Sequence, residues 1–85
     1  MPVVKLYANL RKLAGIKEIS ITGATIGTVI KDLAQQHPSV GEVIIENGEL
    51  RRHILVTVNG HNITNLATLV AEQDIVAIFP PLAGG

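Results

Sequence analysis

The sequence predicts an α+β fold in which one mixed sheet of about five strands packs on one main helix. Three features indicate this fold. Two short segments of alternating apolar and polar residues open the chain, a single amphipathic helical stripe follows them, and residues 75–79 are apolar at every position. A helix with one apolar face buries that face by lying against a sheet.

The start of the chain is expected to form an antiparallel β-hairpin. Its first strand covers residues 2–8 and its second covers 16–22, since both segments alternate with period two. Residues 9–15 are expected to be a fairly long hairpin loop, closed by Gly15 with a positive φ angle. The inward-facing residues are expected to be Val4, Leu6, Ile19 and Ile21.

The main helix is expected to begin after Thr25, whose hydroxyl is a good N-cap acceptor. It ends at His37-Pro38, because proline cannot continue a helix and disfavours helical geometry in the residue before it. Between these limits the apolar residues recur with the period of an amphipathic helix. They are Ile26, Val29, Ile30, Leu33 and Ala34.

Shorter elements are expected between this helix and the last strand. Ser39 and Glu42 have the spacing of a capping box and predict a short helical turn, and residues 46–49 predict a tight turn. A third strand is expected at 54–58, because its residues are mostly β-branched. Asn59-Gly60 and residues 61–63 then complete a short hairpin, and Leu66 and Leu69 are expected to contact the core.

The last strand is expected at Ile75–Phe79 and in the centre of the sheet. Its residues are apolar on both faces, whereas the other strands are amphipathic. From the topology we expect it to lie parallel to the first strand. A hairpin, one helix, a second hairpin and a central final strand make up the β-grasp arrangement.

Composition excludes several classes of function. Seven basic residues balance seven acidic ones, and Tyr7 and Phe79 are the only aromatic residues, so neither nucleic acid nor a membrane surface is an expected partner. The chain has no cysteine, and no apolar run or basic leader resembling a membrane span or signal peptide. A soluble, cytoplasmic protein is expected. The pairs Arg11-Lys12 and Arg51-Arg52 are interpreted as solvated loop charges in preference to a docking patch.

No autonomous active site is expected. His37, His53 and His61 lack the spacing of a metal site, and no Ser/His/Asp grouping or phosphate loop is present. The sheet has only one helix to cover it, so its other face is expected to expose apolar residues to a protein partner or to be covered by residues 39–53. The candidates for that face are Tyr7, Leu55, Ala77 and, most strongly, Phe79.

The ending Phe79-Pro80-Pro81-Leu82-Ala83-Gly84-Gly85 predicts a functional end group. We expect a domain at 1–81 and a flexible tail at 82–85. The two prolines restrict the base of the tail, and glycines have no side chain to obstruct entry into a partner's active site. A frayed terminus without function is the alternative.

The sequence resembles the ubiquitin-like sulfur carriers of the MoaD/ThiS family, and most closely the small subunit of molybdopterin synthase. The resemblance spans the chain and rests on Val58-Asn59-Gly60, on His37-Pro38 and above all on residues 76–85. One departure is Gln73 before Asp74, where members often have glycine. It bears on the turn before the last strand and not on the function.

The resemblance implies a two-stage chemistry at Gly85. A partner adenylyltransferase, similar to a ubiquitin-activating enzyme, would use ATP to adenylate the Gly85 carboxylate. A sulfur donor such as a cysteine desulfurase or rhodanese would then convert it to a thiocarboxylate. The residues Phe79, Pro80, Pro81, Leu82, Ala83 and Gly84 would contact the partners, including the large subunit of molybdopterin synthase.

No cofactor would be bound by the chain alone. The open alternatives are a sulfur carrier for thiamine, cysteine or tRNA thiolation, a ubiquitin-like protein modifier, and a plain interaction module.

Overall fold

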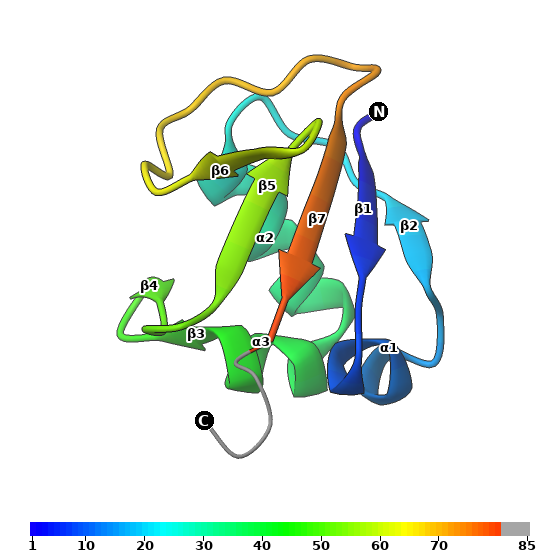
Figure 1. The fold of residues 1–85 in the computed structure, drawn as a ribbon. Coiled ribbons are helices and arrows are strands. Elements are labelled where there is room, and N and C mark those ends of the chain that lie inside the picture. The colour runs from blue at the N-terminus through cyan, green and yellow to red at the C-terminus, as the bar shows by residue number, and fades with distance from the viewer. Residues whose placement is uncertain (81–85) are drawn as a thin grey trace.

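Figure 1 shows the computed structural model, which describes residues 1–80 of the chain. Five strands form one mixed sheet in the order β2-β1-β7-β5-β6, and a separate two-stranded sheet joins β3 and β4. The elements are β1 (Val3–Leu6), α1 (Asn9–Ala14), β2 (Glu18–Ser20), α2 (Ile26–Gln36), α3 (Pro38–Ile44), β3 (Ile45–Glu46), β4 (Glu49–Leu50), β5 (Leu55–Val58), β6 (His61–Ile63) and β7 (Ile75–Phe79). The predicted α+β, β-grasp fold class is confirmed.

Strand β7 lies in the centre of the sheet, as predicted. It is parallel to β1, with Val4 opposite Val76, and antiparallel to β5, with Val56 opposite Ile78. Val76 and Ile78 are fully buried on the helix side. Because β1 pairs with residues 75–78 and β5 with residues 76–79, every residue of β7 is paired with a neighbouring strand on at least one side (Figure 1).

Helix α2 covers the inner face of this sheet and begins where the sequence predicts. The hydroxyl oxygen of Thr25 accepts a hydrogen bond of 3.2 Å from the Thr28 N–H, which satisfies one unpaired donor of the first turn. The core is almost entirely aliphatic. Its buried members are Val4, Leu6, Leu10, Ile21, Ile26, Val29, Ile30, Leu33, Val40, Ile44, Val56, Val70, Val76 and Ile78.

The expected loop at 9–15 is wrong, because residues Asn9–Ala14 form helix α1. Leu10 is fully buried and anchors this helix to the core. Gly15 ends it with φ 77°, and the Gly15 N–H donates to the Arg11 carbonyl oxygen at 2.9 Å. Gly15 therefore does adopt a positive φ, but as a helix C-terminal residue. The strands β1 and β2 remain an antiparallel pair on either side of α1.

The short helical turn that Ser39 and Glu42 predict is confirmed as helix α3, but the capping box itself is wrong. Helix α3 begins at Pro38, and its flanking residue His37 makes no side-chain capping bond. Pro38 both ends α2 and opens α3, since its fixed φ and missing N–H suit the first helical position. The Ser39 hydroxyl instead donates to the Leu13 carbonyl oxygen at 3.3 Å and so links α3 to α1.

The second half of the chain follows the expected turns. Asn59 and Gly60 have φ 50° and 86°, the positive values that a two-residue type I′ hairpin turn requires. Asn47 and Gly48 also have positive φ and join the unpredicted strands β3 and β4. Leu66 is partly buried against the core as predicted, but Leu69 is 78% exposed, so the prediction for Leu69 is wrong.

The turn before β7 forms without the glycine that the resemblance led us to expect. The Asp74 N–H donates to the Ala71 carbonyl oxygen at 3.1 Å, and the Asp74 carboxylate accepts from the Ala71 N–H at 2.8 Å. Gln73 is not among the residues with positive φ. A side chain at position 73 therefore fits this turn.

Candidate functional site

The carboxyl end of β7 carries an aromatic pair. The rings of Tyr7 and Phe79 stack with centroids 4.5 Å apart and planes 16° from parallel. The parallel register places Leu6 opposite Ile78, so Tyr7, directly after β1, lies beside Phe79, the last residue of β7. These two are the only aromatic residues of the chain.

Leu55 extends the aromatic pair across the sheet. It lies opposite Phe79 in the antiparallel pairing of β5 with β7, and 42% of it is exposed. Phe79 is half-buried, and Ala77, two residues earlier on the same face of β7, is buried. The prediction that four residues share the sheet face away from α2 is therefore confirmed for Tyr7, Leu55, Ala77 and Phe79. Ala77 is the only one of the four that is buried. We call Tyr7, Leu55 and Phe79 the aromatic patch.

The aromatic patch lies at the carboxyl end of β7. Phe79 and Pro80 are the last described residues, and both are half-buried. The other predicted site residues, Pro81, Leu82, Ala83, Gly84 and Gly85, lie outside the described residues. The predicted boundary between a domain at 1–81 and a tail at 82–85 also falls there and stays a prediction.

The opposite end of β7 is fixed by a polar network centred on Asn59. Its side-chain amide donates to Asp74 Oδ1 at 2.9 Å, and its side-chain oxygen accepts from the Ile75 N–H at 2.9 Å. The Asn59 N–H in turn donates to the Ile75 carbonyl oxygen at 2.9 Å. The hairpin turn between β5 and β6 is thus bonded to the first residue of β7. The sequence interpretation used Asn59 as a turn residue and as part of the family resemblance, and it missed this role.

The same network lowers the pKa of the Asp74 carboxyl below its ordinary value. The backbone N–H of Ala71 contributes most and the Asn59 amide contributes less, because both donate to the ionised form; partial desolvation opposes them. Asp74 therefore binds its partners as a carboxylate at neutral pH.

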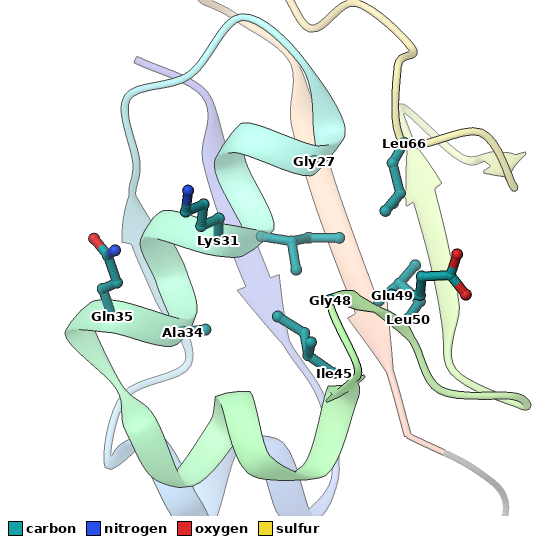
Figure 2. A pocket seen from close by; sticks show the side chains of 10 residues that line it. Gly27, Lys31, Ala34, Gln35, Ile45, Gly48, Glu49, Leu50 and Leu66 are labelled. Carbon is teal, nitrogen blue, oxygen red and sulfur yellow. The ribbon is translucent and has the colours of Figure 1, made fainter.

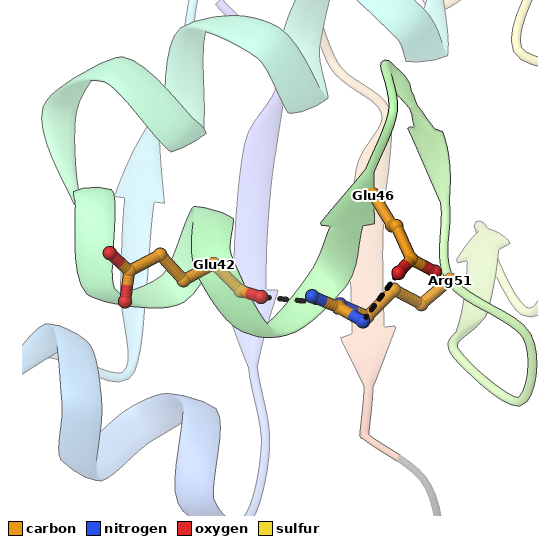
Figure 3. A network of polar contacts seen from close by, with 3 residues as sticks. All are labelled: Glu42, Glu46 and Arg51. Carbon is orange, nitrogen blue, oxygen red and sulfur yellow. Dashed lines mark hydrogen bonds and ion pairs between the residues drawn. The ribbon is translucent and has the colours of Figure 1, made fainter.

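Arg51 is bound to its surroundings and does not extend freely into solvent as a loop charge. Figure 3 shows its guanidinium donating to the Glu42 carbonyl oxygen at 3.2 Å and lying 3.5 Å from the Glu46 carboxylate. The Arg51 N–H also donates to the Ile44 carbonyl oxygen at 2.8 Å. A cation beside the last carbonyls of a helix is favourable, so Arg51 stabilises the end of α3. Arg52 is exposed.

A mostly apolar hollow of about 440 Å³ lies on the helix side of the molecule, between α2 and the β3–β4 hairpin (Figure 2). Ile30, Ala34, Ile45, Leu50 and Leu66 provide its apolar lining, and Lys31 and Glu49 are the charged residues around it. It contains no pair of polar groups suited to acid–base or nucleophilic chemistry. We assign it no reaction.

No metal-binding cluster appears in the part of the chain that the structure describes. No three side chains of histidine, aspartate or glutamate lie together there. His53 and His61 are exposed, and His37 lies between α2 and α3. Over residues 1–80, no helix combines the length and apolar character needed to cross a membrane.

Comparison with known proteins identifies the family. The sequence profile described as the ThiS family matches residues 4–85. Small archaeal modifier protein 3 of Haloferax volcanii is 33% identical over 96% of this chain and 96% of its own. Sulfur carrier protein CysO of Mycobacterium tuberculosis is 35% identical over 84% of this chain and 83% of its own.

The chain is also similar to a plant carrier subunit and to a chain of a solved bacterial complex. The molybdopterin synthase sulfur carrier subunit of Arabidopsis thaliana is 29% identical over 96% of this chain and 80% of its own. The structure of the Amycolatopsis orientalis BexX/CysO complex contains a chain that superposes with a TM-score of 0.88 at 28% identity, covering both chains completely. With a β-grasp sheet, a patch beside the end of β7 and a family match over 4–85, this chain belongs to the ThiS family of ubiquitin-like sulfur carriers and modifiers.

Proposed function

We propose that this chain carries sulfur as a thiocarboxylate on Gly85, after adenylation by a partner enzyme. The observation that supports this most strongly is the position of the aromatic patch. Phe79 ends the central strand, which β1 and β5 flank on its two sides, and residues 80–85 follow it in the sequence. A rigid base next to a narrow Gly-Gly ending suits a group that enters another protein's active site.

The chemistry starts from an ionised carboxylate. A terminal carboxyl has a pKa of about 3.3–3.7, so at neutral pH it is a nucleophile and a poor acyl electrophile. One of its oxygens attacks the α-phosphorus of ATP and pyrophosphate leaves, giving an acyl-adenylate. The terminal sulfur of a persulfide then attacks the acyl carbon and AMP leaves. A thiol finally cleaves the resulting S–S bond and releases the thiocarboxylate.

In this proposal the partners supply everything except the reacting carboxylate. An adenylyltransferase similar to a ubiquitin-activating enzyme binds ATP and excludes water from the adenylate, and a cysteine desulfurase or rhodanese supplies the persulfide. The aromatic patch, with Pro80, Pro81, Leu82, Ala83 and Gly84, is the proposed contact region. We propose that the protein acts in the cytoplasm together with these partners.

Two downstream roles are supported by different observations. The ending at residues 76–85 led to the prediction of a molybdopterin synthase large subunit as recipient, and the 29% identity to a plant carrier subunit is consistent with it. The second candidate is a modifier of proteins or a carrier for cysteine synthesis. It is supported by 33% and 35% identity to an archaeal modifier and to CysO. These identities give the second candidate at least equal support.

The intact mass of the protein tests the shared step. The purified chain is incubated with its adenylyltransferase, ATP and a persulfide donor, and a mass gain equal to one sulfur-for-oxygen exchange is expected. An unchanged mass contradicts the carrier proposal. A covalent adduct joining Gly85 to a lysine of a second protein favours the modifier, whereas co-purification of a pterin-binding large subunit favours the molybdopterin role.

A further inference from the structure

A second surface feature lies beside the aromatic patch and plays no part in the chemistry above. It is a polar hollow of about 250 Å³ at the junction of β1, α1 and β2. The residues that line it are Lys5, Leu6, Tyr7, Arg11, Lys17 and Glu18. Tyr7 belongs to both features, so the hollow and the aromatic patch are continuous.

The hollow has an excess of positive charge. It combines three cationic side chains with one carboxylate, that of Glu18, which lies opposite Lys5 in the β1–β2 pairing. Within residues 1–80 the salt bridges are Met1–Glu72 and Arg51–Glu46, so none of Lys5, Arg11 and Lys17 is paired with a described acidic side chain. Three cations with one nearby anion leave a local field that favours an anionic ligand.

The backbone brings these cations together at an energetic cost. Ala8, directly after Tyr7, has φ 53° and ψ −130°, a conformation that alanine rarely adopts. It turns the chain from β1 into α1, and Arg11 on α1 lines the hollow together with residues at the end of β1 and the start of β2. The Leu6 N–H donates to the Lys17 carbonyl oxygen at 2.9 Å, which holds Lys17 beside the end of β1. Figure 1 shows α1 at the same end of the sheet as the carboxyl end of β7.

We propose that the hollow of Lys5, Arg11 and Lys17 binds an acidic segment of the adenylyltransferase and so orients the carrier while its end is activated. This rests on the proposed function, which names that partner. Charge pairs at the rim of an apolar contact fix its register and accelerate encounter, while the apolar centre provides most of the affinity. The aromatic patch is the apolar centre, and the hollow is its charged rim.

An acidic protein segment fits better than a nucleic acid. The positive charge is confined to three residues in a chain with no net charge, whereas nucleic acid binding draws on many phosphate contacts. The Tyr7 ring, which could stack on a base, already stacks on Phe79. Glu18 inside the hollow opposes any anionic ligand, and it opposes a phosphate chain, with one charge on every phosphate, more than a segment that carries a few separate carboxylates.

The test measures affinity of the full-length carrier for the purified adenylyltransferase by isothermal titration calorimetry at low and high salt. Lys5→Gln, Arg11→Gln and Lys17→Gln are each expected to weaken binding roughly two- to fivefold at low salt. Their combination is expected to flatten the salt dependence. Glu18→Gln is expected to strengthen binding by about twofold, because it removes the repulsive charge. Lys31→Gln removes the same charge from α2, on the other side of the molecule, and is expected to change nothing.

The outcomes separate this inference from the proposed function. Weaker binding of the three variants, with Lys31→Gln unchanged, supports the inference even if no thiocarboxylate forms, in which case only the carrier proposal fails. Equal binding of all variants overturns the inference even if wild-type protein gains sulfur. No binding of wild-type protein also overturns it. A polyuridylate probe that binds more tightly than the enzyme, and loses affinity in the same variants, overturns it in favour of nucleic acid.

Discussion

Tyr7 and Phe79 stack face to face at 4.5 Å although they come from opposite ends of the sequence. The parallel pairing of β1 with β7 makes this contact possible, and the contact couples the start of α1 to the last residues before the proposed reacting end. One aromatic pair therefore joins the two surfaces that we assign to partner binding.

Replacing Phe79 with alanine is expected to weaken binding of the adenylyltransferase more than it lowers the free energy of unfolding. Phe79 is half-buried, so its loss removes contact area in the complex as well as the stack with Tyr7. A double-mutant cycle with Tyr7→Ala and urea denaturation should give a coupling of about 0.5–1.5 kcal/mol.

The control for this prediction is Leu69→Ala, which removes an exposed apolar side chain outside the aromatic patch. It should leave both binding and unfolding nearly unchanged. If Phe79→Ala lowers stability strongly while partner affinity stays constant, Phe79 is a core residue and the patch is not an interface.

Asp74→Asn is expected to lower the melting temperature at neutral pH and to have less effect in acid. The pKa of Asp74 is lowered in the folded state by the Ala71 N–H and then by Asn59, so the carboxylate stabilises the fold above the unfolded pKa of about 3.9. That contribution is lost as the pH falls from there through the folded value. Thermal unfolding followed by circular dichroism from about pH 7 to about pH 2.5 measures the difference.

The matched control is Glu49→Gln, the same carboxylate-to-amide change at an exposed position of β4. The melting curves of Asp74→Asn and wild-type protein should converge in acid. A melting difference that stays constant over the whole range would mean that the Asp74 contribution is steric and not due to its charge.

Ala8→Gly is expected to increase the free energy of unfolding by up to about 1 kcal/mol, since glycine adopts the observed φ and ψ without strain. Ala8→Val should lower it by about 1–3 kcal/mol, because a β-branched side chain is least tolerated at positive φ. Urea denaturation measures both changes. Ala14→Gly, at the last residue of α1, should instead destabilise by up to about 1 kcal/mol. If Ala8→Gly and Ala14→Gly destabilise equally, Ala8 stores no strain.

The sequence predicts elements well where a pattern is long or continuous. Residues 75–79 were correctly predicted because an uninterrupted apolar segment after polar residues has few alternatives. The main helix was correctly predicted because Thr25 and Pro38 mark its limits. Helix α1 was missed because six residues cannot establish a period, and because its start at Ala8 has no capping side chain.

The candidate site was only partly predictable, because some of its residues come together only through the tertiary structure. Phe79 and its face followed from alternation along β7, but Arg11 was interpreted as a loop charge. Only α1 places it beside Lys5 and Lys17. The bond between Asn59 and Asp74 was likewise hidden, because it depends on the tertiary position of the β5–β6 turn. The spacing of Ser39 and Glu42 was misleading, since Pro38 decides where α3 begins.

The most direct test of the central claim compares wild-type protein with a variant that lacks Gly85. Adenylation is measured as pyrophosphate released in the presence of the adenylyltransferase and ATP, and folding is measured by thermal unfolding. We expect the variant to melt at the wild-type temperature and to release no pyrophosphate above background. Activation of the truncated chain at the wild-type rate would contradict the assignment of the reacting carboxylate to Gly85.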